Sequence, residues 1–298
     1  MRYQTDPGSP PFVLLAIVLA RILPRRLGYW VARKVSKRMS QRRSQMFRTL
    51  RANLAHVVGS AIGDGDLDAL AESALYHAGC TYVDMFRATV DDYRSGCVQV
   101  RVDPKEWALA RQATLDERGT VVVGAHMSNF DLAAQWLAAR GIEMQALSLT
   151  RPSSGTRVIN WLRRRRGIVV TPIDVRSLRM ALTRLRRGGV VLTGVDRPVS
   201  EDDEPILFFG APARLPVGHV RLAMQTGSRV LVACCVQEPD GQYGVRFSAP
   251  LEMERTGDRV KDIGHNCRRV LAILEEMIRQ APDQWLMFAP VWPEDDAG

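Results

Sequence analysis

Residues 120–131, TVVVGAHMSNFD, decide the fold that we expect for this chain. The β-branched run at the start predicts a buried strand that ends at Gly124, and the apolar residues after Phe130 predict a helix. His126 then lies in the turn at the carboxyl end of a strand. Open α/β sheets bind their ligands at that edge. The stretch therefore predicts a functional histidine as well as a strand and a helix.

Outward from this stretch, short β-branched runs alternate with helical patterns from Asp103-Pro104 onward. We expect strands at 120–124, 144–149, 168–171, 190–193, 230–236 and 243–247. We expect helices near 132–139, 157–165, 175–187, 219–225 and 259–279. This alternation is typical of βαβ units. It predicts an α/β fold with a mostly parallel central sheet flanked by helices.

The N-terminal part has helical rather than strand patterns, at about 27–58 and 67–93. It also carries the positive charge. Residues 1–60 hold twelve Lys and Arg against the single acid Asp6, a net charge of +11, whereas the whole chain has +9 and the remainder therefore −2. Such a basic block usually faces an anionic partner, either phospholipid headgroups or nucleic acid.

An apolar run, FVLLAIVLA, occupies residues 12–20 inside this basic segment and is followed by Arg21. A bilayer span needs ~20 apolar residues, so nine are too few. A short apolar stretch continued by a basic helix indicates an interfacial anchor instead. We therefore expect residues 1–60 to be a membrane-associating helical segment and residues 61–298 to be the α/β domain, the two forming one continuous globular unit.

His126 and Asp131 are the candidate catalytic pair. On one helix, side chains five residues apart would lie ~140° apart around the axis and could not meet well. With His126 in the turn and Asp131 in the first turn of the helix, the carboxylate can reach back to one imidazole nitrogen, and the other nitrogen can act as general base. The same residues also fit a helix cap, with Ser128 as N-cap and Asp131 bonding back to its amide.

Six blocks in order resemble the bacterial lysophospholipid acyltransferase superfamily, in particular its branch of lipid A lauroyl/myristoyl acyltransferases and phosphatidylinositol mannoside acyltransferases. The segment HMSNFD at 126–131 is similar to the H-x-G-N-[WF]-[DE] block of that family. The other similar segments are Arg51-Ala52-Asn53-Leu54, Leu185 to Val191 followed by Asp196, Phe208-Phe209-Gly210, Thr226-Gly227-Ser228 and Pro282-Asp283-Gln284-Trp285. Ser128 and Phe130 depart from the usual glycine and tryptophan.

The resemblance implies transfer of a fatty acyl group from acyl-CoA or acyl carrier protein to a hydroxyl of a membrane glycolipid or (lyso)phospholipid. His126 and Asp131 would be catalytic, and Ser128 and Asn129 would lie beside the substrate. No cofactor beyond the acyl donor is expected, and no metal. The expected place is the cytoplasmic face of the inner membrane, peripheral or monotopic, with an anionic lipid surface as partner.

Further polar residues are candidates for substrate binding. Arg164 and Arg166 belong to a run of four arginines that could bind phosphates, an acidic carrier or an anionic headgroup, or could simply be solvated at a helix end. Glu204 lies near a position where some family members carry a functional acid, within an acidic loop that could equally be solvated. Asp196 and Arg197 follow an expected strand, and they fit structural ion-pair partners as well as substrate contacts.

Two other classes of function remain open. A hydrolase of the same lipids would use water in place of the acceptor hydroxyl; the chain lacks the G-x-S-x-G elbow of covalent esterases. A nucleic-acid-binding protein would fit the pI of about 9.7, but the basic segment follows an apolar run, which suits a bilayer better. We therefore expect no nucleic-acid partner.

Overall fold

The structure, a computed structural model, describes residues 10–88, 100–200 and 204–292. Its core is a seven-stranded sheet in the order β1-β9-β8-β2-β5-β3-β4, and every neighbouring pair is parallel except β8 and β9. The strands are β1 (Val100–Val102), β2 (Thr120–Gly124), β3 (Met144–Ser148), β4 (Val169–Pro172), β5 (Val190–Gly194), β8 (Arg229–Gln237) and β9 (Tyr243–Phe247). The predicted α/β class with a mostly parallel sheet is confirmed.

Helices cover both faces of this sheet. The helices after the N-terminal part are α6 (Pro104–Leu115), α7 (Phe130–Ala139), α8 (Ser154–Arg165), α9 (Val175–Arg186), α10 (Gly218–Thr226) and α11 (Arg259–Gln280). Alternation along β2 separates two cores: Val121 and Val123 pack with residues of α9, α10 and α11, whereas Val122 packs with α6 and α7. Burial on both faces explains why β2 has three consecutive valines, at positions 121–123.

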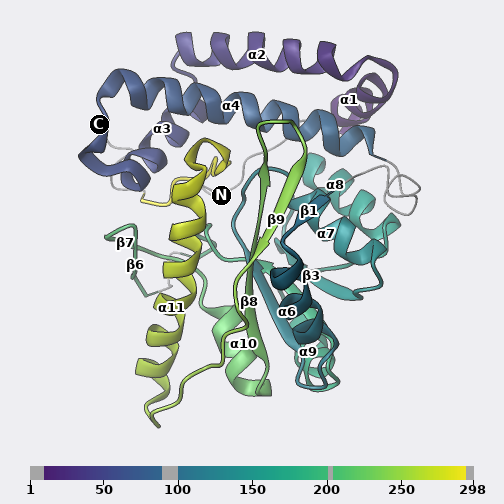
Figure 1. Ribbon diagram of the computed structural model, residues 1–298, viewed down its shortest axis with the longest axis vertical. Coiled ribbons are helices and arrows are strands. Elements are labelled where there is room, and N and C mark those ends of the chain that lie inside the picture. The colour runs from purple at the N-terminus through teal and green to yellow at the C-terminus, as the bar shows by residue number, and fades with distance from the viewer. Residues whose placement is uncertain (1–9, 89–99, 201–203, 293–298) are drawn as a thin grey trace.

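Four helices form the N-terminal part: α1 (Pro10–Ile22), α2 (Arg25–Gln41), α3 (Gln45–Val58) and α4 (Asp64–Arg87). They form a layer across one end of the sheet (Figure 1). Val13 and Ile17 of α1 are buried together with residues of α4 and α8, so α1 belongs to the globular body. Among the described residues, no helix is both long enough and apolar enough to cross a bilayer.

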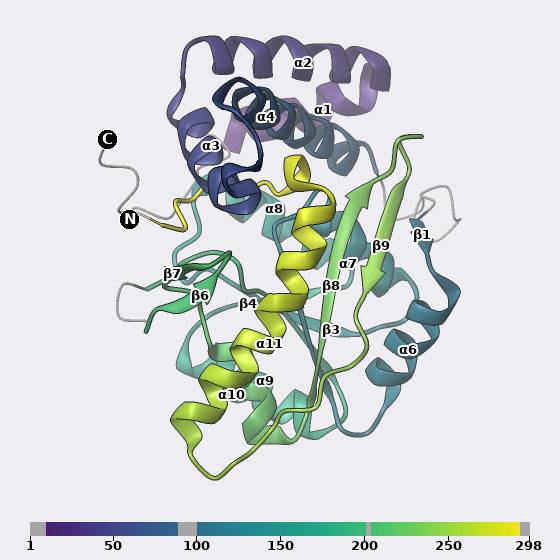
Figure 2. The same cartoon turned by 60° about the vertical axis from the view of Figure 1, so that its left-hand side comes forward.

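The structure adds elements that the sequence patterns did not predict. These are β1, α6 and a small antiparallel hairpin of β6 (Ile206–Phe208) and β7 (Ala211–Ala213), which lies beside α11 (Figure 2). The helix expected at 27–58 is interrupted between α2 and α3, where Arg43 has a φ of 47°. The helix expected at 67–93 ends at Arg87.

Candidate active site

The turn between β2 and α7 carries His126. Asn129 is the N-cap of α7, since its side-chain oxygen accepts a hydrogen bond from the Leu132 amide at 3.1 Å. The alternative cap by Ser128 is therefore wrong. Ser128 has a φ of 43°, in the left-handed region that favours glycine. That backbone geometry explains why glycine is usual at this position in the family that the chain resembles.

Asp196 holds the imidazole of His126. Its Oδ1 lies 2.7 Å from His126 Nδ1, and its Oδ2 accepts the His126 backbone N–H at 2.7 Å. The indole N–H of Trp285 donates to the same Oδ2 at 2.8 Å. This contact follows from sheet topology: β5 pairs with β2 so that Gly194 lies opposite Gly124, and Asp196 and His126 each follow two residues later.

The Asp196 carboxyl is fully buried, with 0% exposure. Burial raises its pKa, but the charge and hydrogen bonds of His126 and the hydrogen bond from Trp285 outweigh burial, so the pKa lies below its ordinary value. The carboxylate is therefore ionised and fixes Nδ1 as the protonated nitrogen. Nε2 of His126 is then the nitrogen that can accept a proton.

Asp131 does not make the predicted contact with the imidazole. Its carboxylate instead pairs with the Arg163 guanidinium of α8 through two hydrogen bonds, one of them 3.0 Å long from Nη2 to Oδ2. Asp131 does lie in the first turn of α7, as expected, and only 6% of it is exposed. The expected carboxylate–imidazole contact thus exists with Asp196 in the place of Asp131, because the strand beside β2 brings Asp196 to Nδ1.

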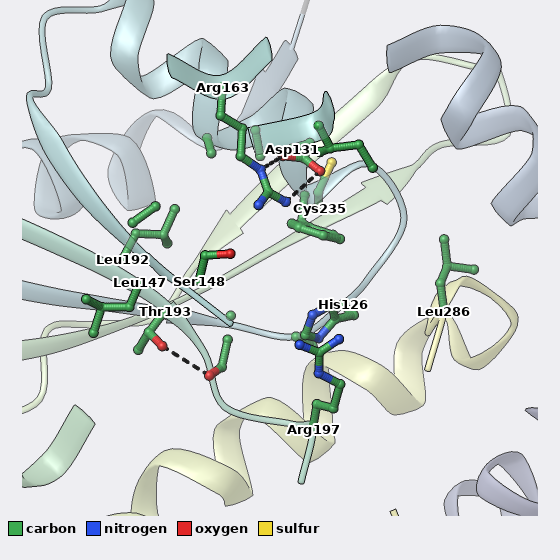
Figure 3. A pocket seen from close by; sticks show the side chains of 18 of the residues that line it. His126, Asp131, Leu147, Ser148, Arg163, Leu192, Thr193, Arg197, Cys235 and Leu286 are labelled. Carbon is green, nitrogen blue, oxygen red and sulfur yellow. Dashed lines mark hydrogen bonds and ion pairs between the residues drawn. The ribbon is translucent and has the colours of Figure 1, made fainter. Parts of the chain in front are cut away.

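The His126 side chain lines a cavity of about 280 Å³. Asp131, Arg163 and Arg197 are the other charged side chains in its lining, and all four are visible in Figure 3. The rest of the wall is mostly apolar and comes from α4, α7, α8, the strands β2, β3, β5 and β8, the residue before β4 and the C-terminal segment; it includes Met85, Ala133, Leu137, Ile168, Leu192 and Leu286. The site thus places the His126 imidazole in the wall of a mostly apolar cavity.

A C-terminal segment, residues 284–291, fixes the turn from the other side. Leu286 donates its N–H to the His126 carbonyl at 2.8 Å, and Ser128 donates to the Gln284 carbonyl at 2.7 Å. The segment is held in turn by Asn53 of α3. The side-chain amide of Asn53 donates to the carbonyls of residues 287 and 289 at 2.8 and 2.9 Å, and its oxygen accepts the N–H of residue 291.

The remaining predicted site residues are placed differently. Ser128 is buried and lines the cavity, whereas Asn129 is occupied as the helix cap. Within the described residues the cavity lining contains Arg163 but not Arg164, Arg166 or Glu204. Arg164 donates to the Val170 carbonyl, and Arg166 bonds the side chain of Gln135 and the carbonyl of Ala88. Glu204 is exposed just before β6.

Sequence reasoning missed the role of three residues that support the site. Asp196 had two open interpretations, and Trp285 and Asn53 were noted only as parts of similar blocks. The signal for all three was therefore the resemblance: each belongs to a separate block, and the fold brings these blocks to His126.

Comparison with known proteins identifies the family of this chain. The sequence model of a family described as bacterial lipid A biosynthesis acyltransferase matches residues 11–294. A phosphatidylinositol mannoside acyltransferase of Mycobacterium tuberculosis (strain CDC 1551 / Oshkosh) is 27% identical over 258 residues, which are 83% of this chain and 77% of the relative. The protein of the same name from Mycolicibacterium smegmatis is 26% identical over 257 residues, 83% and 79% of the two chains. The family match includes the His126 turn, Asp196 and the C-terminal segment.

Proposed function

Because this chain belongs to the bacterial lipid A biosynthesis acyltransferase family, it is an acyltransferase of lipid biosynthesis, and we propose that His126 is its general base. The proposed reaction moves a fatty acyl group from acyl-CoA or acyl carrier protein to a hydroxyl of a membrane lipid. The observation that carries the proposal is the His126 imidazole, with an ionised carboxylate on Nδ1, in the wall of an apolar cavity.

In this reaction Nε2 of His126 takes the proton of the acceptor hydroxyl as its oxygen attacks the thioester carbonyl. Asp196 stabilises the imidazolium that forms. When the tetrahedral intermediate collapses, the carbon–sulfur bond breaks and the imidazolium returns the proton to the leaving thiolate. Both substrates bound side by side give the hydroxyl a high effective concentration, so no acyl-enzyme is needed.

The apolar part of the cavity suits the acyl chain of the donor. Its lining residues include Leu137, Ile168 and Leu192, none of which can hydrogen-bond through its side chain. Each methylene buried from water contributes ~0.8 kcal/mol, so a long chain gains its affinity here while its thioester remains beside His126.

For the acceptor we propose a glycolipid, in the first place a mannosylated phosphoinositide, with a lysophospholipid as the alternative. The curated relatives carry the name phosphatidylinositol mannoside acyltransferase and share 26–27% identity over most of the chain. Support from this chain is the net charge of +11 in residues 1–60, toward which an anionic lipid would be drawn.

We further propose that the protein binds the cytoplasmic face of the inner membrane through α1 and α2. The apolar face of these helices, called here the α1–α2 face, consists of exposed Leu14, Leu15, Val18, Leu19, Ile22, Leu27, Trp30, Val31 and Val35. Exposed basic residues of α2, such as Arg26, Lys34 and Lys37, accompany it. Apolar side chains next to cations are typical of helices that lie in an anionic lipid interface.

The test is the His126→Ala variant, incubated with radiolabelled palmitoyl-CoA and a total bacterial lipid extract. We expect formation of acylated lipid to fall by about 10²–10⁴-fold, because the base is lost, while circular dichroism shows that the variant is folded. His265→Ala is the matched control, because His265 is exposed on α11 and pairs with Glu254. A folded His126→Ala protein with full activity contradicts the proposal, and so does a wild-type protein that forms only free fatty acid.

A further inference from the structure

Arg197 is a guanidinium with no bonded partner among the described residues, whereas Asp131, Arg163 and Asp196 each have one. It follows Asp196 in the loop after β5 and lines the same cavity as His126 (Figure 3). Arg163 is committed to Asp131 and to the side chain of Asn160. Arg197, in contrast, forms no hydrogen bond or ion pair with the part of the chain that the structure describes. Its five N–H donors are therefore available to a ligand.

Arg197 is partly buried and lies near the charges of Arg163 and Asp196. Burial and the nearby charge of Arg163 lower the pKa of Arg197, and the charge of Asp196 raises it, with a lowered pKa as the result. A partly buried cation without hydrogen bonds to the protein lacks the compensation that a paired group has. Such groups in cavities are typical of functional sites. The geometry thus points to an anionic oxygen that arrives with the substrate.

The charges in the site indicate the step of the reaction at which an anionic oxygen would face Arg197. In the resting site Asp131 pairs with Arg163, and Asp196 is bonded to His126. When His126 takes the proton of the acceptor hydroxyl, it becomes a cation that Asp196 already faces. Arg197 is then left as the unbalanced positive charge at the moment when the thioester carbonyl oxygen becomes negative.

We propose that Arg197 binds the carbonyl oxygen of the acyl donor and stabilises the oxyanion of the tetrahedral intermediate. This rests on the proposed acyl transfer. As the acceptor oxygen bonds to the carbonyl carbon, the π-electron pair moves to the carbonyl oxygen, where the guanidinium donates to it. When the carbon–sulfur bond breaks, the pair returns, the carbonyl is re-formed, and the thiolate leaves with the proton from His126.

Backbone amides of the turn are less able to take this role. The His126 N–H is bonded to Asp196, and the Ser128 N–H is bonded to the Gln284 carbonyl. An oxyanion needs donors that are not engaged before the reaction. A phosphate of the acceptor headgroup is the other source of an anionic oxygen for Arg197, and the experiments below separate the two.

The first experiment measures ligand binding without any reaction, by titration calorimetry with decylphosphonate and with decanol. The phosphonate carries a tetrahedral anionic head like the intermediate, and decanol carries a neutral one. We expect the wild-type protein to bind decylphosphonate at least about tenfold more tightly than decanol, and Arg197→Gln to abolish this preference. Arg179→Gln, on the exposed surface of α9, is the matched control and should keep it. An Arg197→Gln protein that retains the preference overturns the proposal.

The second experiment separates the oxyanion from a headgroup phosphate by kinetics with palmitoyl-CoA. Hydrolysis of this thioester by water passes through an oxyanion but involves no acceptor. We expect Arg197→Gln to lower kcat for hydrolysis and for transfer alike, by about 10²–10³-fold, with little change in KM and with partial recovery in Arg197→Lys. Loss of transfer through a raised acceptor KM, with hydrolysis intact, overturns the proposal in favour of headgroup binding.

The melting temperature of Arg197→Gln distinguishes a role of Arg197 in the reaction from a role in the fold. Removal of a partly buried cation that has no partner among the described residues should leave stability unchanged or raised, and a large loss would show that the residue serves the fold. Should the wild-type protein transfer no acyl group at all, the proposed function fails, whereas the phosphonate preference still decides whether Arg197 is an anion site.

Discussion

The role of Asp196 can be tested with a single substitution. In Asp196→Asn the shape is nearly kept but the charge is lost, and the new amide can donate to Nδ1. The imidazole would then carry its proton on Nε2, the wrong nitrogen for a base. We expect kcat for acyl transfer to fall by about 10²–10⁴-fold with a smaller change in the KM for palmitoyl-CoA.

The pH profile of kcat distinguishes this prediction from a general loss of structure. Asp196 favours the imidazolium electrostatically, so its loss should change the pH dependence of any residual activity of Asp196→Asn. Since Trp285 and the His126 amide donate to the same Oδ2, circular dichroism must confirm that the variant is folded. A folded variant with wild-type kcat and an unshifted profile would remove Asp196 from the mechanism.

At the same scale, the sequence predicted a histidine at the end of a strand but not the carboxylate that lies on its Nδ1. His126 was predictable because a β-branched run, a glycine and a polar turn are local signals. The bond to Asp196 joins positions 70 apart in sequence, and it depends on β5 lying beside β2, which no local pattern specifies. Asp131 was the carboxylate nearest in sequence, yet Arg163 of α8 draws it away. Whether Asp131 takes part in the reaction stays a prediction.

At the scale of the elements, substitutions in the α1–α2 face test whether it binds the membrane. Leu15 and Leu19 are 54% and 44% exposed on α1, so their replacement should spare the fold. Leu15→Asp/Leu19→Asp should reduce flotation with anionic vesicles at least about tenfold, because each buried leucine contributes ~1.5–3 kcal/mol. Val260→Asp, at an exposed apolar position of α11, is the control and should float as the wild type does.

Ionic strength distinguishes the electrostatic part of membrane binding from the hydrophobic part. The attraction of α2 cations to anionic lipid is screened at high ionic strength, whereas apolar insertion is not. Wild-type binding should therefore weaken but persist in high salt, and the double variant should then lose all remaining binding. Equal flotation of wild type and double variant would assign membrane binding to another surface.

How well an element could be predicted depended on its length and on its boundary signals. Strands of four or five residues between helical patterns were expected within a residue or two of their bounds, as with β2 and β9. The three-residue β1, β6 and β7 are too short to show a period. The break between α2 and α3 was missed because it contains neither glycine nor proline: Arg43 adopts the positive φ instead.

For the whole molecule, the site is assembled from both ends of the chain. Asn53 from α3 binds the C-terminal segment, that segment holds the His126 turn, and α4 contributes Thr81 and Met85 to the cavity. The helices α3 and α4 thus support the His126 turn and the wall of the cavity. This explains why similar blocks at positions 51–54 and 282–285 accompany the histidine block: their residues meet in space.

The stability of the whole fold should depend on pH through His219 of α10. This side chain is 3% exposed; Nδ1 lies 3.1 Å from the Pro216 carbonyl, and Nε2 has no hydrogen-bond partner among the described residues. Burial lowers its pKa from 6.5 to about 4. Between these values the unfolded chain binds the proton and the folded chain does not, so stability falls as the pH falls from about 7 towards 4 and this loss is complete below about 4.

At pH 5 this histidine alone should cost roughly 2 kcal/mol of unfolding free energy relative to pH 7. His219→Asn retains a donor for the Pro216 carbonyl but does not titrate, so its loss between pH 7 and pH 5 should be smaller by that amount. Urea unfolding of both proteins at the two pH values measures the difference, in which the other histidines cancel because they are shared. Asp196 does not contribute in this window, since its lowered pKa leaves it ionised in both states. Equal losses in the two proteins would mean that the folded state accommodates a charged His219 by opening α10.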